Sequence, residues 1–220
     1  MKPLGILMLD TRFPRIEGDI GNPVSFDFPV IFRTLAGISP ADAVAALPDR
    51  PRVLTALAAN AAALAAQGAI GLSTSCGFLA LYQKELERLS PVPVETSALL
   101  LIARLAGRRV GVITASAANL TPAHLKAVGA PGDTPVEGLP TDGSFAATFL
   151  RNGLTLDRDA VEREAVAAGR ALLRKHPGID TVVLECTNLP PYKAALQKAL
   201  GIPVHDVLDL LKSFHARLAA

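Results

Sequence analysis

Two cysteines, Cys76 and Cys186, are the residues of this chain best suited to chemistry. They are the only two in 220 residues, and each opens a Cys-x-x-Leu-x-x-Tyr pattern at the same interval (186 − 76 and 192 − 82 are both 110). A thiol at a helix N-terminus ionises more readily than a free thiol, because backbone N–H groups and the helix dipole favour the thiolate. A thiolate and a thiol facing one another are a base and an acid. Such a pair could remove a proton from one face of a carbon and deliver another to the opposite face.

Small polar residues follow the predicted strands and surround both cysteines. In an open parallel sheet, ligands bind outside the carboxyl ends of the strands, so we expect these residues to share one cleft. Their hydroxyl, amide and backbone N–H groups could stabilise the enolate that forms when a proton leaves the carbon beside a carboxylate. The candidate substrate-binding residues are Asp10, Thr11, Asn22, Ser75, Gly77, Thr114, Ser116, Thr187 and Asn188.

Each of these residues also has a structural interpretation that requires no ligand. A free cysteine is commonly a small buried hydrophobe, and hydroxyl residues after a strand commonly cap the next helix. Glu185 would then only orient a neighbour or lie under the turn. The two matched cysteine motifs favour function over this alternative.

The elements that position the cysteines form a repeat. Val92-Pro93-Val94 and Ile202-Pro203-Val204 stand at the same interval as the cysteines, which indicates a duplication. Apolar strands are predicted over 4–9, 69–74, 109–116 and 180–184. Their alternation with helices predicts an α/β fold of two similar lobes, each a parallel sheet flanked by helices, related by a pseudo-twofold axis. The first lobe spans residues 1–106 and the second 107–205, with a helix over 206–220 that could pack back on the first.

Helices and loops are assigned from capping residues, apolar periodicity and turn residues. Ser39-Pro40 predicts the start of a helix, and residues 13–30 are rich in glycine and proline, which predicts a long loop. Residues 141–156 have no assigned role, although they could be a lid. Helices are predicted over 40–48, 51–67, 96–106 and 157–176.

Composition limits the classes of function. Half of the residues are apolar, and 22 basic residues oppose 20 acidic ones, so no basic surface for nucleic acid is predicted. The N-terminal apolar run is too short for a signal peptide, and we expect a cytoplasmic protein with reduced thiols and no membrane partner. The four histidines lack metal spacing and no phosphate-binding glycine loop is present, so neither a metal nor another cofactor is expected. The expected partner is a small-molecule carboxylate substrate, and homodimer formation is left open.

The Asp10-Thr11 strand end, the Ser75-Cys76-Gly77 turn and the Glu185-Cys186-Thr187 turn together resemble the Asp/Glu/hydantoin racemase superfamily over the whole chain. The resemblance implies cofactor-independent proton transfer by Cys76 and Cys186. It also implies that Thr187, and by matching position Ser75, bind the substrate carboxylate.

The sequence departs from the glutamate racemases of that superfamily. They typically have Cys-Asn-Thr and Cys-Thr-His, where this chain has Cys76-Gly77-Phe78 and Cys186-Thr187-Asn188. We therefore expect a racemase or epimerase of a small carboxylated substrate, such as aspartate, glutamate or a hydantoin. A cofactor-independent decarboxylase and a maleate-type cis-trans isomerase remain alternatives in the same cleft, as does a two-lobed binding protein without catalysis.

Overall fold

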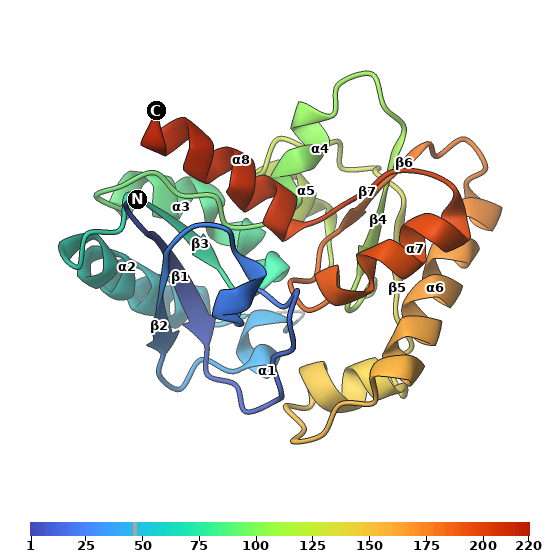
Figure 1. Cartoon of the computed structure of the whole chain (residues 1–220), viewed down its shortest axis with the longest axis horizontal. Coiled ribbons are helices and arrows are strands. Elements are labelled where there is room, and N and C mark those ends of the chain that lie inside the picture. Colours follow the sequence, from blue (N-terminus) through green and yellow to red (C-terminus); the bar gives the residue numbers. More distant parts are fainter. Residues whose placement is uncertain (46–47) are drawn as a thin grey trace.

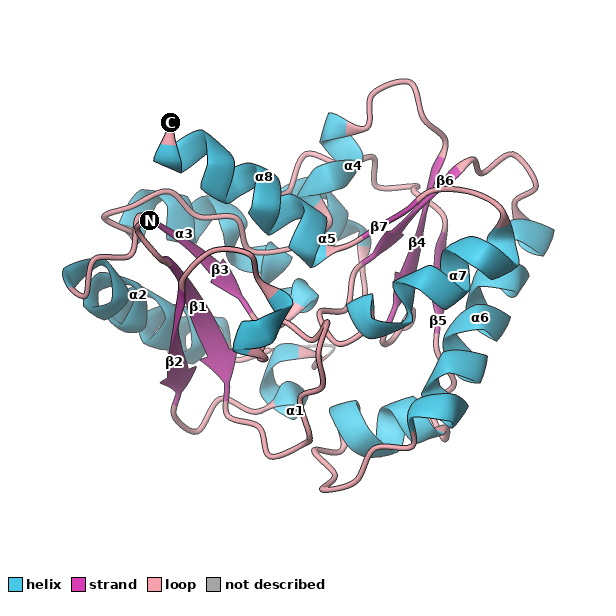
Figure 2. Ribbon diagram, in the orientation of Figure 1, coloured by secondary structure: helices cyan, strands magenta, loops and turns pink. Residues whose placement is uncertain are grey.

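The computed structural model describes residues 1–45 and 48–220, which fold into two α/β lobes (Figures 1 and 2). The first lobe holds a parallel sheet of order β2-β1-β3, and the second a parallel sheet of order β5-β4-β6-β7. The predicted two-lobed α/β fold is confirmed. The strands are β1 (Leu4–Leu9), β2 (Val30–Leu35), β3 (Gly71–Thr74), β4 (Val110–Thr114), β5 (Val136–Gly138), β6 (Thr181–Leu184) and β7 (Val204–His205).

Four of the strands are buried along their whole length. Every residue of β1, β3, β4 and β6 is buried, as expected for strands of a parallel sheet covered on both faces. The edge strand β2 differs, because Arg33 and Thr34 are exposed and only Leu35 is fully buried. This mixed pattern is the reason why the sequence analysis assigned no strand to residues 30–35.

The predicted duplication is visible in main-chain hydrogen bonds. The Leu72 N–H donates to the Pro93 carbonyl, and the Val182 N–H donates to the Pro203 carbonyl, both at 2.9 Å. After each cysteine, the motif leucine donates back to the cysteine carbonyl, at 3.0 Å in the first lobe and 3.1 Å in the second. The same local structure therefore follows β3 and β6 and presents a thiol at each.

Helices cover both sheets. They are α1 (Pro40–Ala43), α2 (Arg50–Ala66), α3 (Gln83–Leu89), α4 (Leu100–Arg104), α5 (Pro122–Ala127), α6 (Arg158–Lys175), α7 (Lys193–Leu200) and α8 (Val207–Ala219). Helix α2 packs on the first sheet, and α6 packs on β4 and β5 with α7 beside it. Short 3₁₀ turns lie at Pro23–Ser25, Gly77–Tyr82 and Pro190–Tyr192, and one π-helical turn lies at Ala146–Leu150.

The C-terminal helix α8 belongs to the packing of the first lobe. It lies beside the N-terminus in Figure 1 and contacts β3, where Phe214 and Leu218 pack against the bare Cα of Gly71. Asp206 caps the helix by accepting from the N–H groups of Leu208 and Asp209 at 2.8 Å and 3.1 Å.

Two predicted helices are shorter than expected. The predicted helix over 96–106 begins only at Leu100, because Thr96 is held in a loop by the Gln83 side chain, to which its N–H and hydroxyl donate at 2.8 Å and 2.6 Å. Helix α1 ends at Ala43, and residues 46 and 47 of the predicted 40–48 helix lie outside the described residues. The predicted helix over 157–176 is confirmed as α6.

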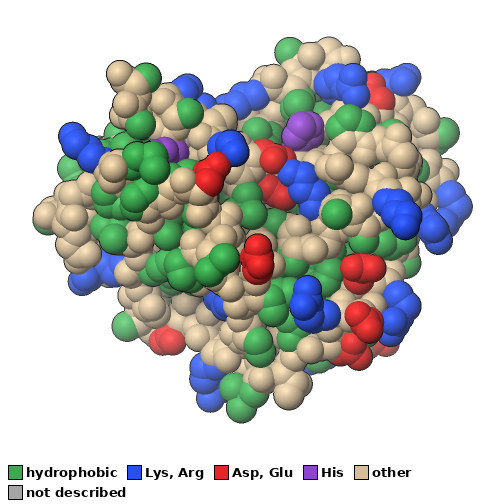
Figure 3. All heavy atoms as spheres, viewed as in Figure 1, with side chains coloured by type: hydrophobic (Ala, Val, Ile, Leu, Met, Phe, Trp, Pro, Cys, Tyr) green, Lys and Arg blue, Asp and Glu red, His purple; other side chains and the backbone are tan. Residues whose placement is uncertain are grey.

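The surface of the molecule carries charges of both signs. Acidic and basic side chains are interspersed over the face shown in Figure 3. Among the helices of residues 1–45 and 48–220, none combines the length and hydrophobicity that crossing a membrane requires.

Candidate functional site

Cys76 and Cys186 line one cavity between the lobes. Its empty volume is about 380 Å³, including the opening to solvent. Each thiol follows a fully buried strand of its own sheet, Cys76 after β3 and Cys186 after β6, and each residue is 9% exposed. The repeat therefore delivers one thiol from each lobe to the same space.

The first cysteine turn is held by main-chain contacts to β1. The Ser75 N–H donates to the Leu7 carbonyl at 2.9 Å, and the Ser75 hydroxyl accepts from the Leu9 N–H at 2.8 Å. The Thr74 hydroxyl donates to the Thr96 carbonyl at 2.7 Å and lies 3.0 Å from the Cys76 carbonyl. Because the Ser75 hydroxyl acts here as an acceptor, its proton is available to a ligand.

The second cysteine turn contacts the first turn directly. The Thr187 hydroxyl donates to the Ser75 carbonyl at 2.6 Å. The Cys186 thiol donates to Asn188 Oδ1 at 3.6 Å, and Asn188 Nδ2 donates to Asp19 Oδ2 at 2.6 Å. The amide of Asn188 thus joins a thiol of the second lobe to a carboxylate of the first.

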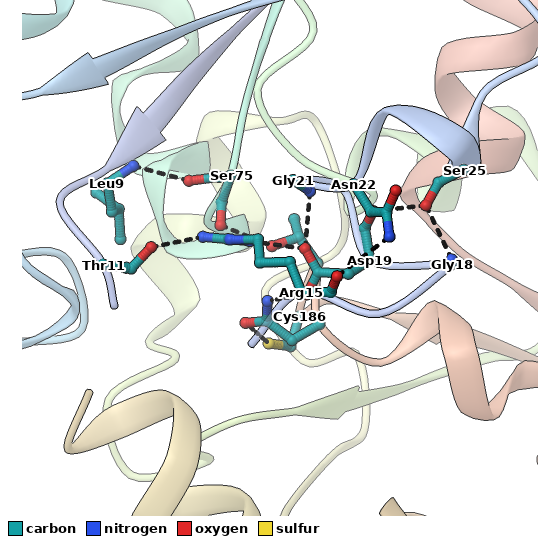
Figure 4. Close-up of polar contacts among 12 residues, drawn as sticks. Leu9, Thr11, Arg15, Gly18, Asp19, Gly21, Asn22, Ser25, Ser75 and Cys186 are labelled. Carbon is teal, nitrogen blue, oxygen red and sulfur yellow. Dashed lines mark hydrogen bonds and ion pairs between the residues drawn. The ribbon is translucent and has the colours of Figure 1, made fainter. Parts of the chain in front are cut away.

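A buried ion pair in the 13–30 loop supports this contact (Figure 4). Arg15 Nη1 donates to Asp19 Oδ1 at 2.7 Å, and Arg15 Nη2 donates to the Thr11 hydroxyl at 2.8 Å. Gly21 leaves room for the guanidinium, since a Cβ there would lie 2.6 Å from Arg15 Nε. Neither Arg15 nor Asp19 was predicted as a site residue, because an arginine in a polar loop gives no signal of burial.

Phenylalanine rings form the apolar wall of the cavity. Phe13, Phe78, Phe145 and Phe149 all line it. Phe149 meets Phe13 edge-on with ring centroids 4.9 Å apart, and it lies 4.8 Å from Phe145. Phe145 and Phe149 come from the 141–156 segment, which was considered as a lid and which here forms part of the wall.

Glu185 is fully buried and lines the same cavity. Its Oε2 accepts from the Thr114 hydroxyl at 2.7 Å. Burial raises the pKa of Glu185 to about 7, against the lowering effects of Thr114 and of the Ala115 backbone. From the sequence, Glu185 was expected only to orient a neighbour or to lie under the turn. Its position in the wall of the cavity was not predicted.

The thiols are less acidic than the sequence predicted. Burial raises the pKa of Cys76 to about 12, with a further increase from the Glu185 charge. Burial also raises the pKa of Cys186 well above its usual value, again with a contribution from Glu185. The predicted lowering of a thiol pKa by a helix N-terminus is therefore wrong for this structure, because desolvation outweighs the backbone N–H groups of the short 3₁₀ turns.

The predicted site residues divide into two groups. Seven line the cavity: Thr11, Ser75, Cys76, Gly77, Cys186, Thr187 and Asn188.

The other four predicted residues lie behind or beside the cavity. Asp10 is exposed and accepts from the Gly37 N–H at 3.0 Å. Asn22 caps the Pro23–Ser25 turn. Thr114 supports Glu185, and the Ser116 N–H donates to the Thr114 hydroxyl at 3.4 Å. Within the described parts of the chain, no three His, Cys, Asp or Glu side chains are grouped as metal ligands.

Residues 41–212 match the family model described as Asp/Glu/Hydantoin racemase. Among curated proteins, dimethylsulfoniopropionate lyase 5 of Emiliania huxleyi (strain CCMP1516) is 31% identical over 97% of this chain and 45% of its own length. The dimethylsulfoniopropionate lyase of Durusdinium sp. clade D is 27% identical over 93% of this chain and 71% of its own length. The chain thus spans about half to seven-tenths of these two relatives.

A similar fold occurs in a solved structure. A mutant of arylmalonate decarboxylase in its sulfate-associated form superposes with a TM-score of 0.67 at 21% identity, covering 99% of this chain and 93% of that one. At this identity the likeness concerns the fold alone.

The Arg15–Asp19 pair gives a prediction for stability. Asp19→Asn removes the charge that neutralises a mostly buried guanidinium, and breaking a buried pair from one side costs roughly 3–5 kcal/mol. We expect urea denaturation to show a loss of free energy of unfolding of that order. Asp27→Asn is the matched control, because Asp27 pairs with Lys212 on the exposed surface, where a pair contributes little. Equal losses in the two variants would contradict the prediction.

Glu185 gives a prediction for the pH dependence of stability. Between pH 4.5, its usual pKa, and about 7, its pKa in the folded chain, the folded protein keeps a proton that the unfolded chain has lost. This group therefore lowers the free energy of unfolding as pH rises through that window, by roughly 3 kcal/mol in total. Glu185→Gln cannot titrate, so the stability of the variant relative to wild type should rise by that amount between pH 4.5 and 8 in urea denaturation. A constant difference across that range would show that Glu185 does not titrate there.

Proposed function

This chain belongs to the Asp/Glu/hydantoin racemase family, and on that premise we propose that it moves a proton at the α-carbon of a small carboxylate, with Cys76 and Cys186 as acid and base. The observation that carries the proposal is that two thiols, one from each lobe, line a single cavity. The α-proton of a carboxylate is weakly acidic, so a base and donors to the developing enolate are both required.

Two hydroxyl groups of the cavity are suited to anchor the substrate carboxylate. Thr11 and Ser75 each accept a hydrogen bond, from Arg15 and from the Leu9 N–H respectively, so their own protons can be donated to a ligand. The Arg15 cation also polarises the Thr11 hydroxyl toward an anion. A carboxylate held by both hydroxyls would lie near the two cysteine turns.

The apolar wall favours β-elimination from a substrate with a cationic sulfur group. Phe78, Phe145 and Phe149 line the cavity together with the thiols, and the face of an aromatic ring attracts a sulfonium as it attracts other onium cations. The Phe13 ring is already covered by the Arg15 guanidinium, whose Cζ lies 4.5 Å from the ring centroid. Among the described residues, Glu185 is the one carboxylate that lines the cavity, so an α-ammonium group finds few acceptors there. The similarity to dimethylsulfoniopropionate lyases points to the same substrate class, a 3-sulfoniopropionate.

The elimination follows from the same proton transfer. A cysteine thiolate takes the α-proton, the electrons of that C–H bond form the Cα–Cβ double bond, and the Cβ–S bond breaks with its electrons on sulfur. The products are an unsaturated carboxylate and a neutral sulfide, and the proton remains on the thiol.

Racemisation is the second candidate. A racemase needs an acid and a base on opposite faces of the carbon, and the presence of two thiols from two lobes favours this reaction for a carboxylated substrate such as aspartate, glutamate or a hydantoin. Decarboxylation and cis-trans isomerisation would pass through a related enolate in the same cavity.

The two reactions differ in their need for the second thiol. With dimethylsulfoniopropionate as substrate, we expect wild type to release dimethyl sulfide, which gas chromatography measures. Because elimination needs a single base, we expect only one of the variants Cys76→Ser and Cys186→Ser to lose rate, by about 10²–10⁴-fold. For racemisation, both variants would lose α-proton exchange between enantiomers in D₂O, measured by NMR. If wild type neither exchanges nor eliminates with any of these substrates, and alkylation of the thiols leaves ligand affinity unchanged, the protein is a binding protein without catalysis.

The Phe149 ring provides a test of the substrate class. Phe149→Leu removes one aromatic face while keeping an apolar wall, and a cation–π contact contributes about 0.5–2 kcal/mol. We expect the affinity for dimethylsulfoniopropionate to fall roughly 2–30-fold. The control ligand is 4-methylpentanoate, which has the same shape without the charge and should bind the variant nearly as well as wild type. An equal loss for both ligands would mean that the ring serves shape rather than charge.

A further inference from the structure

Asn188 links the Cys186 thiol to a carboxylate of the other lobe. The Cys186 thiol donates to Asn188 Oδ1 at 3.6 Å, and Asn188 Nδ2 donates to Asp19 Oδ2 at 2.6 Å. All three residues are buried, and Asn188 lines the cavity beside the thiol. A buried chain of hydrogen bonds of this kind fixes the orientation of each member.

Asp19 determines which end of the Asn188 amide faces the thiol. Its other oxygen, Oδ1, accepts from Arg15 Nη1 and from the Gly21 N–H, both at 2.7 Å (Figure 4). The guanidinium favours the ionised form of Asp19. An ionised carboxylate only accepts hydrogen bonds, so the amide nitrogen must face Asp19 and the amide oxygen must face Cys186. That oxygen carries no hydrogen, so it can only accept the thiol proton.

This arrangement favours the protonated form of Cys186. A thiolate would have no proton to give to the amide oxygen, and the negative end of the amide dipole would face the negative sulfur. Burial is the largest cause of the raised pKa of Cys186, and the Glu185 charge is the second. The Asn188 backbone N–H acts in the opposite direction, whereas the charges of Cys76 and Asp19 raise the pKa of Cys186 further.

The groups beside Cys76 favour its thiolate instead. Burial and then the Glu185 charge raise the pKa of Cys76, as they do at the other thiol. The N–H groups of Phe78 and Leu79 lower that pKa, and so does the Arg15 cation. The Arg15 side chain is only 13% exposed, so water screens its charge weakly. The two thiols thus share the cost of burial but differ in their neighbours, with N–H donors and a cation at one and an amide oxygen and a carboxylate at the other.

We propose that Asp19, acting through Asn188, holds Cys186 as the protonated thiol, so that Cys76 is the base that takes the α-proton of the substrate. The inference rests on the proposed function and assigns the two thiols their roles in it. In elimination, the substrate Cα–H bond breaks and the Cys76 S–H bond forms, while the C–H electrons form the Cα–Cβ double bond and the Cβ–S bond breaks. The Cys76 proton passes to solvent after the products leave, and Cys186 keeps its own proton throughout. Asp19 is a positioning residue, because it acts on the thiol only through the amide.

Raman spectroscopy of the S–H stretching band tests the hydrogen bond directly. In Cys76→Ser the band belongs to Cys186 alone, since the chain has only two cysteines. We expect the hydrogen bond to hold this band at low frequency. Adding Asn188→Leu, which keeps the size of the side chain without an acceptor, should move the band to higher frequency. A band that Asn188→Leu leaves unchanged would overturn the proposal.

The role of Asp19 is tested in the same Cys76→Ser background. Asp19→Asn lets the Asn188 amide turn its nitrogen toward the sulfur, so we expect the S–H band to move to higher frequency as in Asn188→Leu. Asp27→Asn is the matched control, because Asp27 pairs with Lys212 on the exposed surface, and it should leave the band in place. A band that is equally unaffected by both aspartate substitutions would show that Asp19 does not set the orientation of the amide.

Alkylation of the full chain measures the relative reactivity of the two thiols. Iodoacetamide labelling at slightly alkaline pH, followed by mass spectrometry of both cysteine peptides, should label Cys76 faster than Cys186 in wild type. Asn188→Leu removes one hydrogen bond that favours the thiol, so Cys186 labelling relative to Cys76 should rise by about 2–10-fold. The ratio excludes a general opening of the cavity, which would raise both rates. An unchanged ratio, or faster labelling of Cys186 in wild type, would contradict the assignment.

The cysteine variants separate this inference from the proposed function. If wild type eliminates, Cys76→Ser should lose about 10²–10⁴-fold in rate while Cys186→Ser keeps most of it. The reverse result would overturn the assignment of the base and leave the proposed function standing. If wild type shows neither elimination nor α-proton exchange, the proposed function fails, while the Raman band and the labelling ratio still decide whether Asn188 holds Cys186 as a thiol.

Discussion

The contact between the two cysteine turns is the interaction on which the cavity depends. The Thr187 hydroxyl donates to the Ser75 carbonyl at 2.6 Å, and the Glu185 side chain lies against Gly77. Both contacts join one lobe to the other and both are buried, where a polar group deprived of its partner is not rescued by water. The lobes consequently cannot shift against each other at this point without moving both thiols.

The fold could largely be predicted because its central elements leave strong local signals. Uninterrupted apolar runs marked β1, β3, β4 and β6, and the long amphipathic pattern marked α6. The 110-residue interval of the motifs reappears in the hydrogen bonds of Leu72 and Val182. The elements that were missed or misjudged depend on tertiary contacts instead. Strand β2 is half exposed, and the start of α4 is set by a side chain from another helix.

The residues correctly predicted to line the cavity all follow a strand end. The cysteines and their polar neighbours line it because the direction of each strand fixes where the chain goes next. Asp10 also follows a strand, but its side chain accepts from the Gly37 N–H and it is the next residue, Thr11, that lines the cavity. Asn22 does not line the cavity, since the path of the 13–30 loop depends on tertiary contacts. The Arg15–Asp19 pair was missed for the same reason. Glu185 stood beside a recognised motif, yet its importance lies in a contact with the other half of the chain.

The Glu185–Gly77 contact also means that the two halves of the duplicated chain are no longer interchangeable. Ser75 and Glu185 occupy equivalent places in the repeat, and so do Gly77 and Thr187. Two copies of the first half would set a serine against a glycine and leave a void. Two copies of the second half would press a glutamate onto a threonine, in a space that does not admit even one Cβ. The two cysteine turns are therefore complementary in shape, with a glutamate in one and a glycine in the other. A substitution at Glu185 or at Gly77 consequently restricts which residues are tolerated at the other position.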